Sequence, residues 1–487
     1  MLSRLLFAVF IFVILFFFSF ARADSMLQEG YIVNAKMKSL AKGADQSPWV
    51  ETDDIKAIRM AEALPDNFIP SDANTVSIDG SEHPIFIFFD NDHDAGIIYF
   101  YTESETVVLN PNSSSLFANN TNLTDISCLA SWNSSNVVWM NGMFARDISL
   151  SDISPLSNWD VHNVTGLAQM FLYASSLSDI SALSNWDVSN VMDMHGLFCG
   201  AKGITDALSL RDWDTSNVTD MSFLFSGANS LTAIDVSNWD TSKVTTMVSM
   251  FQVGDSYAGN GQLREILGLG NLDVSNVTDM TCMFYGSGQM TYYDIAGWDV
   301  SKVESMNHMF CDNFNLRSLD LSTWDVTNIK TMYCMFDDNY KLKTIGDVSH
   351  WNTASLIDVG GWLNGATSFV GDNNGVLDLS GWDTRNLKTA GEMFRATKLR
   401  TIDLSGWTFD SIINDRWEGE GKGIYYETGN TFQACKGLGQ MFKDTAQLKT
   451  VYVSQSGLDS FNKAIEAEIN VLDMWTGSKT EGFTVKK

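Results

Sequence analysis

A repeat of about 27 residues is the feature that most limits how this chain can fold. Tryptophan recurs before a polar turn, and the early steps are 27, 27, 27 and 26 residues. Leu272 takes the same place between two of these tryptophans. Such a period is typical of a solenoid, in which each unit buries its apolar side only by stacking on its neighbours. The ladder consists of Trp132, Trp159, Trp186, Trp213, Trp239, Trp298, Trp324, Trp351, Trp382 and Trp407.

A second ladder of aromatic residues keeps the same register. Its members each follow Met or Leu: Phe117, Phe144, Phe171, Phe198, Phe225, Phe251, Phe284, Phe310 and Phe336. We expect Trp362 to take the next place, and Phe394 and Phe442 to continue the series after insertions. Because one unit cannot bury these rings alone, both ladders are predicted to be columns of a shared core.

Each unit reads roughly L-x-x-I-D-L-S-x-W-D-[VT]-S-N-V-x-x-M-x-x-M-F. The stretch from Leu399 to Leu404 alternates apolar and polar residues, which predicts a half-buried strand and hence a parallel sheet along one face. The polar W-D-[VT]-S-N segment is predicted to turn, because Asp, Ser, Thr and Asn side chains bond nearby backbone groups. The spacing of Val218, Met221 and Phe225 predicts a short helical or 3₁₀ turn.

The segments outside the repeat divide the chain into four parts. Residues 1–23 read as a secretory signal peptide, with Arg4 before an apolar run and a small-x-small site ending at Ala23; an uncleaved anchor is the alternative. Residues 24–111 are predicted to be a small α+β cap, with a helix over 26–41 and two strands around the loop in IFIFFDNDHDAGIIYFYTE. Residues 112–453 form the solenoid of about twelve coils, and residues 454–487 a C-terminal cap with a helix after a final strand. Insertions at 254–262, 371–375 and 409–436 should project from the stack.

The charge is strongly negative. The chain has 59 acidic and 31 basic residues, a net charge of −28. Such a field repels nucleic acid and anionic membranes, and it favours basic or divalent-cation partners, unless it serves only solubility. After removal of the signal no further apolar segment is long enough to enter a membrane.

The repeats SNWDVSNVMDMHGLF, RDWDTSNVTDMSFLF, LDVSNVTDMTCMF and STWDVTNIKTMYCMF resemble those of the BspA-like leucine-rich-repeat surface proteins. The resemblance covers about residues 116–453, and LPDNF, PIFIFFD, IIYFYTE and VVLNP resemble the segment before the repeats in that family. It implies a leucine-rich-repeat-like fold and an extracellular or cell-surface protein. Some members adhere to host matrix or to other cells. It implies no catalytic residues and no cofactor.

An acidic column on the predicted strands is our candidate contact surface. Strand alternation should turn these carboxylates outward, opposite Ile or Leu, although simple solvation also explains them. The members are Asp235, Asp320, Asp347, Asp378 and Asp403. The Asp that follows each Trp, as in Asp214, and the Asn three residues later, as in Asn217, are interpreted as turn formers, because their side chains can satisfy backbone groups.

Other chemistry is weakly indicated. The six cysteines fall too far apart in the repeat register to pair, so mostly free, buried thiols are expected. Asp90, Asp92 and Asp94 resemble a calcium loop only in part; a hairpin turn is the simpler interpretation, with weak Ca²⁺ association as the alternative. No metal site is predicted, and no catalytic motif is present in the sequence.

These observations predict a secreted or cell-surface repeat protein that is no enzyme and binds an extracellular protein or cell-surface ligand. The alternative is a structural surface-layer or spacer protein without a specific ligand. A catalytic site in the 409–436 insertion is a third, weaker hypothesis, because that segment adds Trp417, Tyr425 and Tyr426 to an otherwise regular repeat.

Overall fold

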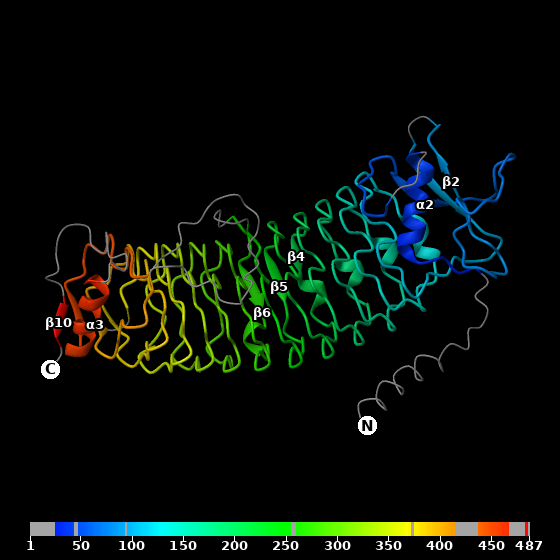
Figure 1. The fold of residues 1–487 in the computed structure, drawn as a ribbon. Helices are drawn as coiled ribbons and strands as arrows, with labels where there is room; N and C mark the ends of the chain where they lie inside the picture. Colours follow the sequence, from blue (N-terminus) through cyan, green and yellow to red (C-terminus); the bar gives the residue numbers. More distant parts are fainter. Residues whose placement is uncertain are drawn as a thin grey trace, which may run out of the picture.

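The computed structural model describes residues 25–42, 47–92, 95–254, 260–371, 375–413, 437–466 and 483–485. The expected signal peptide, the centres of the insertions and Cys435 lie outside these ranges. The chain forms one elongated solenoid, with a helix-containing unit at its N-terminal end and α3 and β10 at the other (Figure 1). The predicted repeat solenoid is therefore confirmed.

The N-terminal unit packs α2 (Gly30–Lys42) beside a three-stranded sheet. In this sheet β1 (Ala57–Met60) pairs parallel with β3 (Ile97–Tyr101), and β2 (Phe86–Asp90) pairs antiparallel with β3. The helix begins at Gly30 rather than Met26, because Met26 and Leu27 form β-bridges to Val108 and Ser77 instead. The sequence did not indicate β1.

The parallel sheet face of the solenoid is present in two separate pieces. One consists of β4 (Asp206–Ala207), β5 (Ala233–Asp235) and β6 (Glu265–Leu267). The other consists of β7 (Val376–Asp378), β8 (Thr401–Leu404), β9 (Thr450–Val453) and β10 (Phe483–Val485), all parallel. After β9 the chain forms α3 (Gln455–Glu466).

Short 3₁₀ helices replace strands in the first coils and follow β4 and β6 in two later ones. They are η2 (Ser127–Ser131), η3 (Ser154–Leu156), η4 (Ser181–Leu183), η5 (Leu208–Leu210) and η6 (Leu269–Asn271). The helical turn predicted over Val218–Phe225 is wrong in position, because that segment forms a chain of turns instead. Left-handed residues two places before and after the ladder Phe, such as His308 and Asp312 beside Phe310, prevent a helix there.

A ladder of single parallel β-bridges also joins the coils, at the residues just before the Met-x-x-Met-Phe segments. It runs from Asn112 to Thr389 with one bridge per coil, for example Asp193↔Asp220 and Asp220↔Thr246. Backbone N–H groups of the Met-x-x-Met-Phe segment also donate to the next coil, as in Phe144 N to Met170 O at 2.9 Å. The polar backbone is therefore satisfied between coils although little regular sheet is present.

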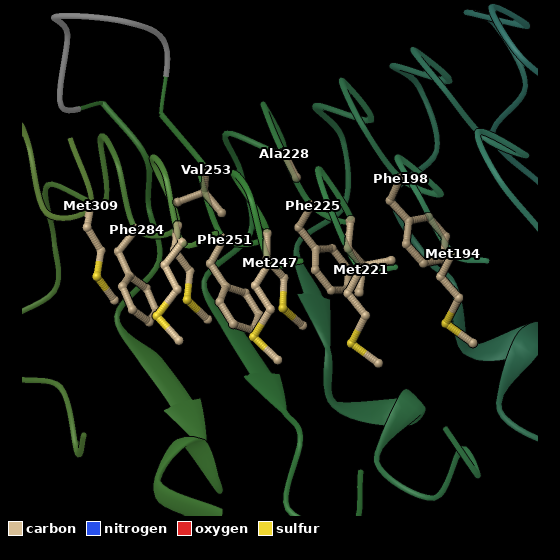
Figure 2. Close-up of a cluster of buried hydrophobic side chains, with 14 of the residues drawn as sticks. Met194, Phe198, Met221, Phe225, Ala228, Met247, Phe251, Val253, Phe284 and Met309 are labelled. Atoms are coloured by element: carbon tan, nitrogen blue, oxygen red, sulfur yellow. The ribbon is translucent and has the colours of Figure 1, made fainter. Parts of the chain in front are cut away.

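The core is a continuous row of side chains inside the coils. Figure 2 shows Phe198, Phe225, Phe251 and Phe284 on successive coils, with Met194, Met221 and Met247 beside them. Neighbouring Phe rings stack with centroids 5.3–6.4 Å apart from Phe117 to Phe336, a spacing at which aromatic pairs attract.

The ladder position assigned to Trp362 belongs to its neighbour. Phe336 N donates to Trp362 O, and Leu363 N donates to Met393 O, both at 2.9 Å. In the regular coils the ladder Phe donates to the residue just before the next ladder Phe. Leu363 therefore occupies the Phe position, and Trp362 fills the preceding Met position with its ring against Phe336, Trp351 and Trp382.

Candidate binding surfaces on the solenoid

The tryptophan column is buried, and its indoles link the coils. All ten rings are at most 5% exposed. Trp213 Nε1, for example, donates to Leu183 O of the preceding coil at 2.9 Å. Equivalent bonds join Trp159, Trp186, Trp239, Trp298, Trp324, Trp351, Trp382 and Trp407 to their preceding coils. Trp132 belongs to the first coil, and its buried Nε1 finds no acceptor among the described residues. This column therefore holds the stack together and offers no contact surface.

The strand Asp column is only partly on the surface. Asp320 and Asp347 are exposed and Asp378 is half-buried, but Asp235 and Asp403 are only 8% and 5% exposed. The expectation that all five carboxylates face solvent is therefore wrong for Asp235 and Asp403. These two lie in regular sheets, where Leu267 and Tyr452 are their register partners on the next strand, and Arg211 approaches Asp235 to 3.7 Å.

Every Asp of this column also accepts a hydrogen bond within its own coil. Oδ1 accepts the backbone N–H of the Ser two residues later, at 2.9–3.1 Å, in all five cases. For Asp320 and Asp347 the side-chain hydroxyls of Ser322 and Ser349, followed by these backbone N–H groups, lower the pKa of the carboxyl. Each therefore stays ionised while one oxygen holds the turn, which leaves the other oxygen available to a partner.

The Asp after each Trp behaves as the turn former that its sequence suggests. Asp214 Oδ1 accepts the backbone N–H of Ser216 at 3.0 Å. The same bond, from the N–H two residues after the Asp, is formed by Asp160, Asp187, Asp240, Asp273, Asp299, Asp325 and Asp383. The Asn column does more than was expected. Asn217 Nδ2 donates to Ser189 O of the preceding coil at 2.7 Å, and most of its counterparts repeat the bond. These amides connect coils as well as turns.

A cluster of carboxyls, with Asp312 buried and Asp337 and Asp338 partly buried, lies beside the Phe column and was not found from the sequence. Burial raises the pKa of Asp337 well above its usual range, and the neighbouring Asp338 and Asp312 add to this. Burial also raises the pKa of Asp338, and it raises that of Tyr340 to about 12 with help from these carboxyls. Asn364 Nδ2 donates to Asp337 Oδ1 at 2.8 Å. Tyr340 is partly exposed and stacks on Phe314 at 5.0 Å. The site combines an aromatic surface with protonatable acids.

The junction between the N-terminal unit and the first coil is another polar site. Lys38 of α2 is fully buried, and its Nζ donates to Pro48 O, Val50 O and Ala118 O at 2.7–2.8 Å. Asn34 Nδ2 donates to Ser115 O and Ala118 O. In later coils the carbonyl equivalent to Ala118 O accepts a backbone N–H from the coil before it. Side chains of α2 therefore replace the missing coil.

The thiols and carboxyls form no metal site among the residues that the structure describes. Cys128, Cys199, Cys282, Cys311 and Cys334 are free, as expected, but only Cys311 and Cys334 are fully buried. Burial raises the pKa of Cys199 to about 11 and of Cys128 and Cys282 to about 12, so these thiols stay protonated. Asp90 Oδ1 accepts Asp92 N at 2.8 Å between β2 and β3, as in a hairpin turn; Asp94 of the calcium-like motif lies outside the described part of the chain.

Stacked coils with an aromatic spine and short parallel strands define a leucine-rich-repeat-like solenoid protein. The family model described as "Mycoplasma protein of unknown function, DUF285" matches residues 110–183, 177–265, 257–376 and 346–417. The chain therefore belongs to this family. No curated protein sequence matches the chain.

Solved structures that resemble the chain include other repeat proteins. A leucine-rich repeat protein from Bacteroides ovatus aligns at 11% identity over 79% of this chain and 84% of its own, with a TM-score of 0.32. An internalin from Listeria monocytogenes aligns at 14% identity over 69% of this chain and 76% of its own, with a TM-score of 0.21. Within the described ranges, no helix is long and apolar enough to cross a bilayer.

Proposed function

We propose that the protein is a non-catalytic binding module of the cell surface or extracellular space, which recognises a protein or cell-surface ligand through the exposed side of its coils. The main support is that the Trp and Phe columns are buried between the coils and cannot contact a ligand. Exposed positions, by contrast, recur at each coil of a scaffold that inter-coil hydrogen bonds hold in place. A rigid repeated surface of this kind suits binding to an extended partner. The signal-like N-terminus and the similarity of the repeat motif to BspA-like surface proteins support this location.

Asp320 and Asp347 are the strongest candidates for ligand contact within the strand Asp column. Both are exposed, both are ionised, and each keeps one carboxylate oxygen outside its own turn. Neither forms an ion pair with a described residue. Asp235 and Asp403 are no longer proposed as contacts, because they are buried.

The test is binding of the purified protein to matrix proteins and to cells, measured across salt concentration. The double variant Asp320→Asn and Asp347→Asn removes two charges while the amide oxygen can still accept the Ser N–H of the turn. We expect saturable, salt-sensitive binding that weakens several-fold in this variant. A matched control is Asp299→Asn with Asp325→Asn, which neutralises two carboxylates of the turn column after Trp. Absence of any saturable binding would contradict the proposal and favour the structural spacer.

A further inference from the structure

One surface column changes its chemistry halfway along the solenoid. It contains the two residues that follow the buried Leu or Ile at the start of each strand segment. In the first coils these pairs are a hydroxyl residue and an aspartate: Thr124-Asp125, Ser151-Asp152, Ser178-Asp179 and Thr205-Asp206. In the last coils, except for Val370-Gly371 after Phe369, they are a basic residue and a hydroxyl residue: Arg317-Ser318, Lys343-Thr344, Arg400-Thr401 and Lys449-Thr450. We name these the acidic half and the basic half of one face.

Backbone hydrogen bonds show that both halves belong to the same column. Thr205 N donates to Ser178 O, and Thr232 N donates to Thr205 O. Further along, Lys343 N donates to Arg317 O at 2.9 Å. Lys449 N donates to Arg400 O, also at 2.9 Å, in the same way. Each step joins adjacent coils, which lie about 4.8 Å apart as paired strands do.

The charged groups of the basic half are exposed and available. Arg317, Lys343, Arg400 and Lys449 are all exposed, and none forms an ion pair with a described residue.

The acidic half is equally open. Asp152, Asp179 and Asp206 are exposed. Each uses only Oδ1, to accept the N–H that begins its own 3₁₀ or turn segment. Asp125 differs, because Arg59 of β1 neutralises it at 3.0 Å.

We propose that this face binds a second copy of the chain, antiparallel, so that the acidic half of each copy meets the basic half of the other. A twofold axis near the coils between Thr232 and Tyr292 would bring the halves together. The same surface would then form the interface on both copies. A linear polyanion would fit the basic half alone and would meet the aspartates if it continued along the same face. The second copy matches both halves, and for that reason we favour it. This inference goes beyond the proposed ligand binding and does not depend on it.

The experiment is sedimentation velocity of the full mature chain and of two charge-reversal variants. The first variant, Arg317→Glu with Lys343→Glu, reverses two of the four charges of the basic half. The second, Asp152→Lys with Asp179→Lys, reverses two of the four charges of the acidic half. We expect the wild type to form dimers whose fraction falls between about 50 and about 500 mM NaCl, because salt screens exposed charges. Each variant alone should be monomeric, and their equimolar mixture should form a heterodimer.

Controls separate charge from folding. Lys243→Glu with Lys302→Glu makes the same charge change on the turn column, where both lysines are exposed and bond to Asn side chains, and it should leave the dimer intact. Because Asp152 and Asp179 also hold their turns, Asp152→Asn with Asp179→Asn keeps an acceptor there and should weaken the dimer without unfolding.

A wild type that is monomeric at every concentration and salt would overturn the proposal, as would a dimer that survives the first variant or a mixture that stays monomeric. Dextran sulfate retention by a monomeric wild type, lost in the first variant, would assign the basic half to an anionic polymer instead. Matrix or cell binding that depends on Asp320 and Asp347 is measured separately, so failure of either proposal is recognised by itself.

Discussion

Individual indole rings combine packing with a polar link between coils. Trp213 is 1% exposed and donates to Leu183 O. Trp213→Ala should therefore lower the free energy of unfolding by about 3–5 kcal/mol, through the lost burial, the cavity and the unpaired carbonyl. Urea denaturation followed by circular dichroism measures this change. Trp139→Ala is the control, since that ring is 48% exposed, and it should cost under about 1 kcal/mol. Equal effects in both variants would place the column at the surface.

A second prediction concerns the buried carboxyl of Asp337. Burial raises its pKa in the folded protein above the value of 3.8, so the folded state holds a proton that the unfolded state has released. Stability should therefore decrease as pH rises from about 4 through the folded pKa. Asp337→Asn removes this cost and keeps an acceptor for Asn364. We expect a higher melting temperature at neutral pH and a flatter pH dependence in calorimetry, whereas a lower neutral-pH melting temperature would show that the charged form is stabilised.

The position and burial of individual side chains could be predicted from sequence only where a single structural interpretation fitted the pattern. The Trp and Phe columns combine a strict step with bulky apolar side chains, and few arrangements except a stacked core satisfy both. Asp235 and Asp403 were misplaced because strand alternation takes no account of the neighbouring strand, on which Leu267 and Tyr452 are their register partners. Trp362 was placed one position wrong because an indole in the Met position looks like a ladder member.

Secondary-structure elements were harder to predict than columns. Apolar spacings of three and four suggested a helix around Phe225, yet left-handed residues on both sides of the ladder Phe turn the chain instead. Cys282 and Cys334 both have positive φ angles. A cysteine in the sequence does not indicate this conformation, whereas a glycine would. Three of the 3₁₀ helices, η2, η3 and η4, begin directly after the Ile of an I-S-x-L stretch. In η3, Asp152 accepts the backbone N–H of Ser154, the first residue of the helix.

The α2 helix should act as a removable lid on the backbone of the first coil. Lys38→Met keeps the volume but leaves three carbonyls without their donor, so the N-terminal unit should open locally. Hydrogen exchange should accelerate in residues 25–42 and 113–120 and remain unchanged around Phe394. Lys42→Met is the matched control, because Lys42 is exposed and makes a 3.9 Å contact with Asp54 and a 3.4 Å hydrogen bond to Glu51 O at the surface. Uniform acceleration along the whole chain would instead indicate a single cooperative unit.

At the level of the entire chain, a net charge of −28 opposes compaction. Added salt should therefore raise the melting temperature of dilute, monomeric protein between about 20 and about 300 mM NaCl, since screening relieves this repulsion. Differential scanning calorimetry at several NaCl concentrations tests this. A melting temperature that falls with salt would mean that local ion pairs outweigh the overall repulsion.

The joints between neighbouring coils are chemically alike from Asn112 to Thr389, with one bridge per coil and the same indole bond at nearly every step. The two ends, by contrast, need dedicated helices. The number of coils in the middle of the protein can consequently change, whereas the two end structures cannot. In-frame duplication of one central unit would extend the reach of the molecule by a single coil and leave both termini undisturbed, so related chains are free to diverge in span sooner than in architecture.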